Sequence, residues 1–215
     1  KNWKNITIFA WIHWDEISWI NALNELLKKF ELKELTLKNW KLNLVTLCNI
    51  KAHKQNKRFI SKDLNRCFKK TNLWENDEEV RALELMSILD ESDVLLDLHS
   101  TSAKAMEFAF AETKALELAK NIWIKNIIAW WWELWDSTIA WDTENYMNSL
   151  WWIWITFEAW SHLDKDAKNK SLQVSLNLLS HFNMIDNSYF KVLDWVEKIA
   201  KISEIYVSKT WNFNY

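Results

Sequence analysis

The stretch NITIFAWIHWDE, residues 5–16, decides the predicted fold. Residues 6–10 form a short apolar run rich in β-branched side chains, which is typical of a buried strand. His13 and Glu16 follow it directly, and open α/β sheets bind their ligands beyond the carboxyl ends of strands. Imidazole and carboxylate are zinc ligands, and a catalytic zinc usually has three protein ligands plus water. Taken alone, an H-x-x-E pair is more often a polar surface turn, so further residues must decide.

Strand-like and helix-like segments alternate along the rest of the chain. Apolar runs that predict strands occupy residues 42–47, 94–98, 124–129 and 151–159. Helical periodicity covers residues 17–30, 75–89, 113–120 and 171–184, and a further helix is expected over 189–202. This alternation predicts an α/β fold, in which helices flank a mostly parallel or mixed central sheet.

Two more polar residues stand where apolar strands end. His99 follows the run VLLDL, and Glu158 lies at the end of WWIWITFEA. Each has a structural interpretation, because a buried histidine or carboxylate is retained when it has a hydrogen-bonding partner. Parallel strands, however, end at the same edge of a sheet, so these residues are expected near His13 and Glu16. Together the four would supply three metal ligands and one carboxylate left as a base.

Composition and charge exclude several classes of function. Lys and Arg number 27 against 29 Asp and Glu, so the chain has no basic footprint for nucleic acid. No apolar run reaches about 18 residues, which argues against a membrane span. Two cysteines, Cys48 and Cys67, do not indicate a disulfide framework, and a reducing cytoplasm is the expected location. The 215 residues suit one α/β domain, or one domain and part of a second.

The chain contains 18 Trp but no Gly and no Pro. Average glycine usage is about 7%, and a globular chain without glycine lacks its usual residue for left-handed turns. Several tryptophans stand where turns are expected, including Trp40 and Trp211. Our hypothesis is that these positions are glycine in the natural protein, because some bacterial codes read UGA as Gly. A protein genuinely rich in Trp is the alternative, and the missing Pro has no explanation.

Four motifs, in this order and spacing, resemble the succinylglutamate desuccinylase/aspartoacylase family, a branch of the zinc carboxypeptidase superfamily. They are WIHWDE (11–16), DLNRCF (63–68), DLHST (97–101) and WITFEAWSH (154–162). With Trp read as Gly, the first and last become GIHGDE and GITFEAGSH, which makes the resemblance closer. It covers about residues 5–185.

The resemblance implies a role for each residue of the predicted site. His13, Glu16 and His99 would bind one zinc ion per chain, and Glu158 would be the general base that activates water. The segment RFISKDLNR would supply the arginine that polarises the scissile carbonyl, Arg58.

The same segment would hold the substrate. Asn65 and Arg66 match the pair that binds a substrate carboxylate in the family, and Asp63 would support them. The planar fork of an arginine suits a carboxylate because it can bind both oxygens. Outside the family context, this basic segment would be a solvated surface.

The resemblance also implies a domain organisation. Residues 1–187 would form the zinc-carboxypeptidase-like catalytic domain, and residues 188–215 would begin a truncated C-terminal β-rich domain, starting near 204–207. Some members use an arginine upstream of the base for a second substrate carboxylate. Residues 126–157 contain none, which argues against a substrate of the N-acetylaspartate type.

The function implied is zinc-dependent hydrolysis of the amide bond of a small N-acyl amino acid, with no nucleic acid or membrane partner. Two alternatives stay open. A zinc metallocarboxypeptidase or amidase acting on peptides would use the same metal site with a different pocket. A non-catalytic binding module would fit if the tryptophans are genuine or if the expected C-terminal part that is missing is essential.

Overall fold

The computed structural model describes residues 5–10, 17–70, 74–101, 106–129, 141–161, 166–192 and 198–201. The strands in these ranges are β1 (Asn5–Ala10), β2 (Lys41–Val45), β3 (Val94–Thr101), β4 (Phe108–Phe110), β5 (Asn126–Ala129), β6 (Ile153–Ser161) and β7 (Lys198–Lys201). The helices are α1 (Ile17–Glu31), α2 (Ile50–Lys54), α3 (Asp77–Asp90), α4 (Lys114–Asn121), α5 (Thr143–Ser149) and α6 (Ala167–His181), with short 3-10 turns η1 (Leu64–Arg66) and η3 (Asn187–Tyr189).

The strands form one mixed sheet in the order β2-β1-β3-β6-β4-β5-β7. The strands β2, β1, β3 and β6 are parallel to one another, and β4 pairs antiparallel with β6. The last two strands, β5 and β7, run parallel to β4. The predicted α/β fold with a mostly parallel or mixed sheet is therefore confirmed.

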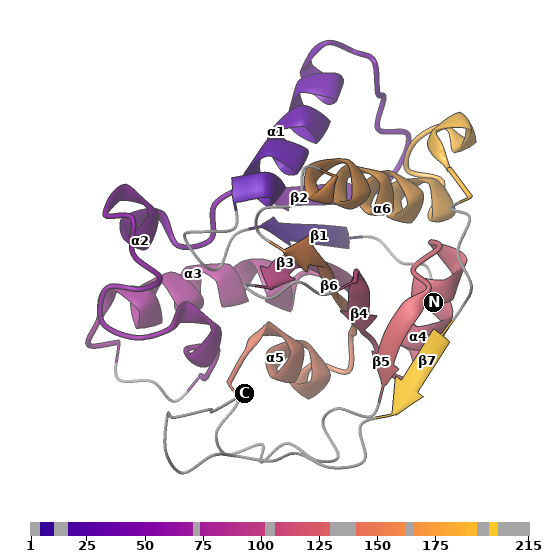
Figure 1. Ribbon diagram of the computed structural model, residues 1–215. Helices are drawn as coiled ribbons and strands as arrows, with labels where there is room; N and C mark the ends of the chain where they lie inside the picture. The colour runs from indigo at the N-terminus through magenta and orange to yellow at the C-terminus, as the bar shows by residue number, and fades with distance from the viewer. Residues whose placement is uncertain are drawn as a thin grey trace.

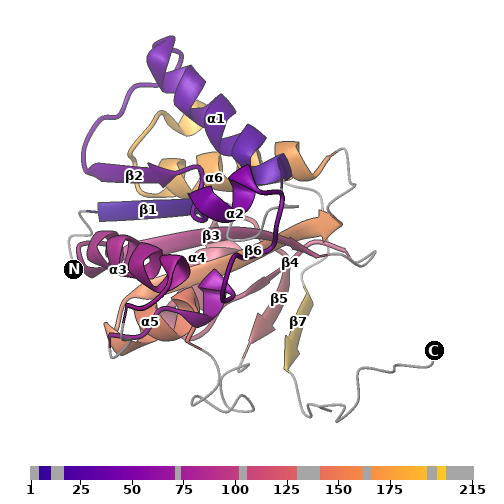
Figure 2. The ribbon, with the colours of Figure 1, turned by 90° about the vertical axis from the view of Figure 1, so that its left-hand side faces the viewer.

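Helices cover both faces of the sheet (Figures 1 and 2), with α1 and α6 on one face and α3 and α5 on the other. Successive strand residues point to opposite faces, so β3 contributes to both layers. Leu96 and Leu98 join the cluster packed against α1 and α6, whereas Leu95 joins the cluster against α3 and α5. Both faces of the central strands are thus buried, which explains their continuous apolar sequence.

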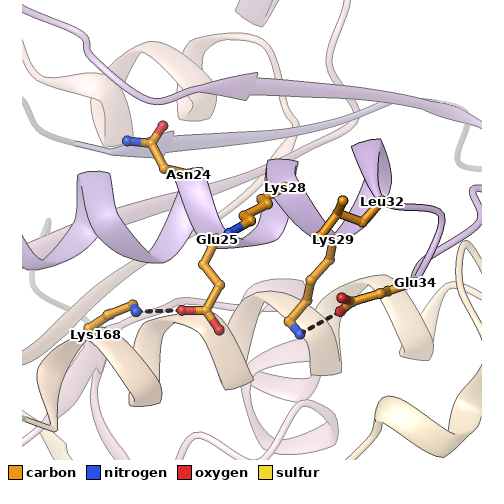
Figure 3. A pocket seen from close by; sticks show the side chains of 7 residues that line it. All are labelled: Asn24, Glu25, Lys28, Lys29, Leu32, Glu34 and Lys168. Atoms are coloured by element: carbon orange, nitrogen blue, oxygen red, sulfur yellow. Dashed lines mark hydrogen bonds and ion pairs between the residues drawn. The ribbon is translucent and has the colours of Figure 1, made fainter.

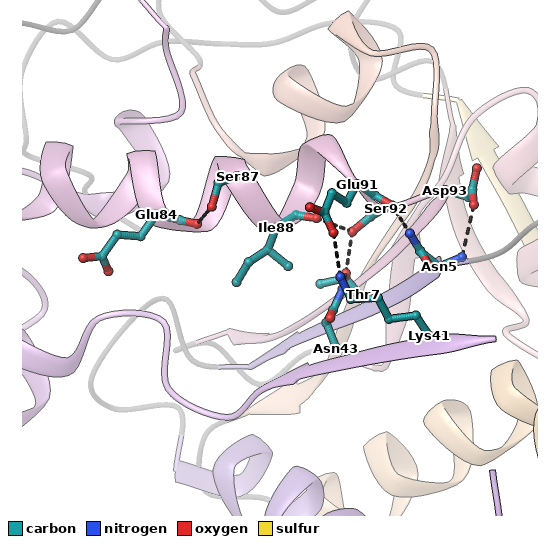
Figure 4. Close-up of polar contacts among 10 residues, drawn as sticks. All are labelled: Asn5, Thr7, Lys41, Asn43, Glu84, Ser87, Ile88, Glu91, Ser92 and Asp93. Atoms are coloured by element: carbon teal, nitrogen blue, oxygen red, sulfur yellow. Dashed lines mark hydrogen bonds and ion pairs between the residues drawn. The ribbon is translucent and has the colours of Figure 1, made fainter.

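A chain of hydrogen bonds fixes α3 to the amino-terminal edge of the sheet (Figure 4). The Asn43 amide donates to Thr7 Oγ1 (3.0 Å), and the hydroxyls of Thr7 and Ser92 are 2.5 Å apart. The Ser92 hydroxyl donates in turn to the carbonyl of Ile88 near the end of α3 (2.7 Å). Because Thr7 is fully buried, these bonds satisfy a polar group that would otherwise destabilise the core.

The structure corrects the sequence analysis in three places. The helix predicted over 189–202 is wrong, because residues 198–201 form β7, which pairs with β5. Sheet pairing overrides helix propensity there. The short antiparallel strand β4 and the helix α5 were not predicted. The expected C-terminal segment 204–207 lies outside the described residues.

Tryptophans occupy left-handed backbone positions. Trp40, Trp74, Trp123 and Trp151 have φ of 86°, 58°, 67° and 62°. A bulky residue at positive φ is a genuine outlier, whereas glycine takes this conformation readily. The positions therefore support the hypothesis that Trp stands where the natural protein has Gly.

Two of these tryptophans follow helix ends. Trp151 N–H donates to Asn148 O (3.0 Å) and Trp152 N–H to Met147 O (3.2 Å), after α5. The same pair of hydrogen bonds follows α4, where Trp123 is the residue in the left-handed conformation. This pattern is the Schellman motif, whose left-handed residue is usually Gly and sometimes Asn. After α6, the equivalent residue is Asn183.

Among the described residues, no helix has the length and apolar content needed to cross a membrane.

Candidate active site

The candidate site begins at the carboxyl ends of β3 and β6, which are neighbours in the sheet. His99 of β3 lies in register with Glu158 of β6. On the face under α3 and α5, the paired residues of β3 and β6 become more polar toward the carboxyl ends of the strands. The pairs are, in order, Leu95–Trp154, Asp97–Thr156 and His99–Glu158. Side chains two residues apart share a face of a strand, so this gradient delivers both predicted residues to the same place. His99 and Glu158 therefore lie side by side at this end of the sheet.

Asp97 lies beside His99 and was not identified in the sequence. Asp97 is fully buried, and its Oδ1 lies 3.2 Å from His99 Nε2, a close approach without hydrogen-bond alignment. A carboxylate facing one ring nitrogen favours the proton on that nitrogen. The lone pair that a metal requires is then on Nδ1. The two-residue spacing in the motif DLHST was the signal that could have identified Asp97.

The first turn of α5 joins β3 to the segment that carries the predicted substrate residues. The Thr143 hydroxyl donates to Asp97 Oδ2 (2.6 Å), and the Thr143 main-chain N–H donates to Asn65 Oδ1 (3.2 Å). The helix begins here because the side chain of Asp142 caps it, accepting from Asn145 N (2.8 Å). An aspartate followed by a polar first turn was the sequence signal for α5.

Asp63 organises the segment that carries the two arginines. Its Oδ1 accepts from Asn65 N (2.9 Å), which caps η1, and its Oδ2 pairs with Arg58 Nη2 (3.2 Å). Arg66 ends η1, and its Nη1 donates to the Asn65 carbonyl (2.6 Å). Asn65 and Arg66 therefore reach the region of His99 through α5. Arg58 has a side chain that is 52% exposed, and within the described ranges its pair with Asp63 is what ties it to them.

Acidic groups accumulate at the amino end of α5. Burial raises the pKa of Asp142, although the nearby charge of Arg66 opposes this rise. Burial, reinforced by the charge of Asp142, raises the pKa of Glu144 well above its usual range. Thr156, two residues before Glu158 on the same strand, lies beside the Glu144 carboxyl and partly opposes this rise in its pKa. Glu144 is therefore close enough to Asp97, Asp142 and His99 for their charges to act on it.

His13 and Glu16 lie outside the described residues, so these two predicted ligands stay predictions. Within the described ranges, no group of three His, Cys, Asp or Glu side chains could hold a metal. The residues present nevertheless fit the predicted zinc. Ala10, the last residue of β1, pairs with Leu98, so the chain leaves β1 beside His99. His99 itself presents Nε2 to a carboxylate, as metal-binding histidines usually do.

A pocket of about 420 Å³ lies elsewhere, on the α1 side of the sheet (Figure 3). It is lined by Asn24, Glu25, Lys28, Lys29, Leu32, Glu34 and Lys168. Lys29 pairs with Glu34 (3.1 Å) and Lys168 pairs with Glu25 across its rim. Two of its three lysines are paired with its two glutamates, and the pocket lies across the sheet from Asp97, so it does not belong to the candidate site.

Comparison with known proteins identifies the family that the chain resembles. A family model described as the succinylglutamate desuccinylase/aspartoacylase catalytic domain matches residues 2–125. A protein of Nostoc sp. (strain PCC 7120) named "Probable aspartoacylase" is 40% identical over 88 residues, which cover 36% of this chain and 30% of that protein.

Two solved structures share the fold. The product-bound ectoine utilization protein EutE (DoeB) of Ruegeria pomeroyi has a TM-score of 0.73 and 16% identity, covering 94% of this chain and 62% of that one. A succinylglutamate desuccinylase from Silicibacter sp. TM1040 has a TM-score of 0.73 and 16% identity, covering 92% and 61%. This chain thus spans about three fifths of the length of these two proteins.

Proposed function

The chain belongs to the succinylglutamate desuccinylase/aspartoacylase family, and we propose that it is a zinc-dependent hydrolase that cleaves the amide bond of a small N-acyl amino acid. The observation that carries the proposal is the in-register pairing of His99 with Glu158 at the strand ends. Asn65 and Arg66 are tied to the same place through Thr143. A metal ligand, a base and carboxylate-binding groups are what such a hydrolysis requires.

His13, Glu16 and His99 would hold the zinc ion. When bound, the ion supplies Lewis-acid activation of water and of the scissile carbonyl. Glu158 takes one proton from the attacking water as its oxygen bonds to the carbonyl carbon. Glu158 then returns that proton to the nitrogen, the C–N bond breaks, and a carboxylic acid and an amine are released.

The arginines act on the two ends of the substrate. Arg58 donates to the carbonyl oxygen, on which negative charge develops in the transition state. Arg66 and Asn65 bind the carboxylate of the amino acid, since charge-assisted bonds to a planar guanidinium are strong and directional. No arginine occurs in residues 126–157, so we expect N-acyl amino acids with neutral side chains to be better substrates than N-acetylaspartate.

The described cysteines are consistent with a cytoplasmic location. Cys48 and Cys67 are both buried, and neither forms a disulfide. Free thiols persist in a reducing compartment.

The decisive experiment replaces the base while keeping the metal. Glu158→Gln retains the shape of the side chain but cannot accept a proton, so kcat is expected to fall by about 10² to 10⁴. Zinc content, measured on the same sample, is expected to be unchanged. Activity is assayed on a panel of N-acyl amino acids. Peptides with a free C-terminus, which a carboxypeptidase would shorten, are the comparison substrates.

Three results would contradict the proposal. Loss of zinc together with activity would make Glu158 a ligand or a structural residue. Retention of both would remove Glu158 from the mechanism. Release of C-terminal residues from peptides, without deacylation of the panel, would replace the proposed reaction with that of a carboxypeptidase.

A further inference from the structure

We propose that Thr143 is a positioning residue that orients two site residues at once, Asn65 through its main-chain N–H and His99 through its hydroxyl and Asp97. The inference rests on the proposed function, because it assigns Thr143 a purpose within that site. Thr143 is 1% exposed and stands in the first turn of α5, between η1 and β3. Among the residues that the structure describes, it is the single one that hydrogen-bonds to both η1 and β3.

The main-chain arm fixes the amide of Asn65. A main-chain N–H can only donate, so the amide atom 3.2 Å from Thr143 N is the oxygen Oδ1. The other amide atom, Nδ2, then carries two N–H donors away from α5. A substrate carboxylate accepts hydrogen bonds and offers none. Thr143 therefore holds Asn65 in the orientation that binds a carboxylate, and the flipped amide would repel it.

The side-chain arm fixes the carboxylate of Asp97. The Thr143 hydroxyl donates to Oδ2 at 2.6 Å, and the other oxygen, Oδ1, lies 3.2 Å from His99 Nε2. Because Asp97 is fully buried, it has no bulk water that could replace the hydroxyl. With Oδ2 held, Oδ1 stays 3.2 Å from Nε2, where its negative charge favours the imidazole proton on that nitrogen although the two atoms are not aligned as a hydrogen bond. The nitrogen Nδ1 is then the metal-binding atom.

These two arms are chemically separable. Any substitution at position 143 other than proline keeps the N–H that meets Asn65, whereas only Ser retains a hydroxyl that can reach Asp97. Thr143→Val removes the hydroxyl and keeps the volume and the β-branch. Thr143→Ser keeps the hydroxyl and removes one methyl group. The pair therefore distinguishes hydrogen bonding from packing.

The experiment measures zinc affinity, kinetics and the tautomer of His99 for wild type and both variants. For Thr143→Val, we expect zinc affinity, from competition with a chelator, to fall about 10- to 100-fold. We expect kcat to fall with it when the enzyme is not saturated with zinc, and KM to change less than about twofold because the Asn65 arm is intact. Thr143→Ser is expected to restore wild-type values.

The tautomer is read from long-range ¹H–¹⁵N NMR spectra of the metal-free protein. Wild type and Thr143→Ser are expected to carry the neutral imidazole proton on Nε2, and Thr143→Val to show a substantial Nδ1–H population. Asp97→Asn is the second variant that breaks the same arm, and it is expected to shift the tautomer in the same direction should Thr143→Val fail to fold.

Two outcomes would overturn the positioning role. One is a Thr143→Val protein with wild-type tautomer and zinc affinity. The other is equal impairment in Thr143→Ser and Thr143→Val, which would assign the effect to packing. A wild-type protein without zinc or deacylase activity would instead refute the proposed function, and the tautomer comparison would still test Thr143.

Discussion

The two arginines of the segment RFISKDLNR lie in different surroundings. Arg58 has a side chain 52% exposed and pairs with Asp63. Arg66 is part-buried and donates to the Asn65 carbonyl, and its charge acts on the buried Asp142. An exposed arginine with a single carboxylate partner can turn toward a charge that appears during the reaction. A fixed one is suited to a charge that is present in the ground state.

Substitution of the two arginines is therefore expected to separate kcat from KM. Arg58→Ala is expected to lower kcat by about 10² with a small change in KM, because its partner charge develops in the transition state. Arg66→Ala is expected to raise KM by about 10- to 100-fold, because it removes a charge-assisted contact with bound substrate.

Steady-state kinetics with one N-acyl amino acid measure both effects. Lys57→Ala serves as the control, because Lys57 is an exposed cation next to Arg58 and is expected to change neither parameter. Small and equal effects from all three substitutions would mean that this basic segment is only a solvated surface.

At the scale of single elements, the end of α5 tests whether tryptophan is the natural residue. Trp151 has a positive φ and is 90% exposed, so its indole contributes little packing. A left-handed conformation costs a residue with a Cβ about 1–2 kcal/mol. Trp152, its neighbour, is partly buried against the cluster under α3 and α5.

We expect Trp151→Gly to raise the free energy of unfolding by about 1 kcal/mol. Trp152→Gly is the matched control and is expected to lower it by about 1 kcal/mol or more, since it removes packing and adds chain entropy. Urea denaturation measures both. A Trp151→Gly protein less stable than its parent would contradict the glycine hypothesis at this position.

The first turn of α3 holds the arginine segment in place. Glu78 is 1% exposed, and its two carboxylate oxygens accept from Ile60 N (2.5 Å) and Ser61 N (3.2 Å). Its neighbour Glu79 pairs with Lys62 (3.2 Å). The turn between Arg58 and Asp63 is thus docked on a helix N-terminus, where acidic residues are favourable.

A double-mutant cycle tests whether Glu78 acts through Arg58. Glu78→Gln keeps the shape but presents an amide group to one main-chain N–H, so we expect kcat to fall about tenfold. In the Arg58→Ala background, the same substitution is expected to change kcat less than about twofold.

Glu84→Gln, on the exposed side of the same helix, is the control and is expected to leave kcat unchanged. If Glu78→Gln reduces kcat by the same factor in both backgrounds, Glu78 stabilises the fold without positioning Arg58.

At the scale of the whole molecule, the burial of Cys67 links stability to pH. The thiol is fully buried and donates to the Asp63 carbonyl (3.3 Å). Burial raises its pKa to about 12 from the ordinary value near 9. A group whose pKa is higher in the folded state than in the unfolded state contributes its full stabilisation of the fold at pH values below its unfolded pKa. That contribution is lost as the pH rises from about 9 toward 12, at up to about 1.4 kcal/mol per pH unit.

Cys67→Ser removes this titration while keeping a donor for Asp63. Between pH 9 and 10, the free energy of unfolding of the wild type is expected to fall about 1 kcal/mol further than that of the variant. Urea denaturation under reducing conditions at pH 8, 9 and 10 measures the difference. Parallel pH dependences would show that the thiol does not titrate differently in the folded and unfolded chain.

Some residues of the candidate site can be predicted from the pattern of a strand, whereas others matter only because of contacts between elements. His99 and Glu158 were predictable, because each ends an apolar run and parallel strands end together. Asp97 follows from the two-residue period of the same strand. No local sequence pattern identifies Thr143, because its importance comes from its position between η1 and β3, which are far apart in the sequence. His13 and Glu16 stay predictions.

The sequence by itself determined the alternation of strands and helices, the residues that end β3 and β6, and the glycine-like places of several tryptophans. These depend on local periodicity and on single residues. Only the tertiary structure decided the antiparallel direction of β4, the replacement of a predicted helix by β7, and the orientation of Asn65 and Asp97. These depend on hydrogen bonds between segments 46 to 78 residues apart, such as that from Thr143 to Asn65. A local sequence pattern carries no record of such partners, because the energy of a long-range bond appears only after the chain has closed the loop between them.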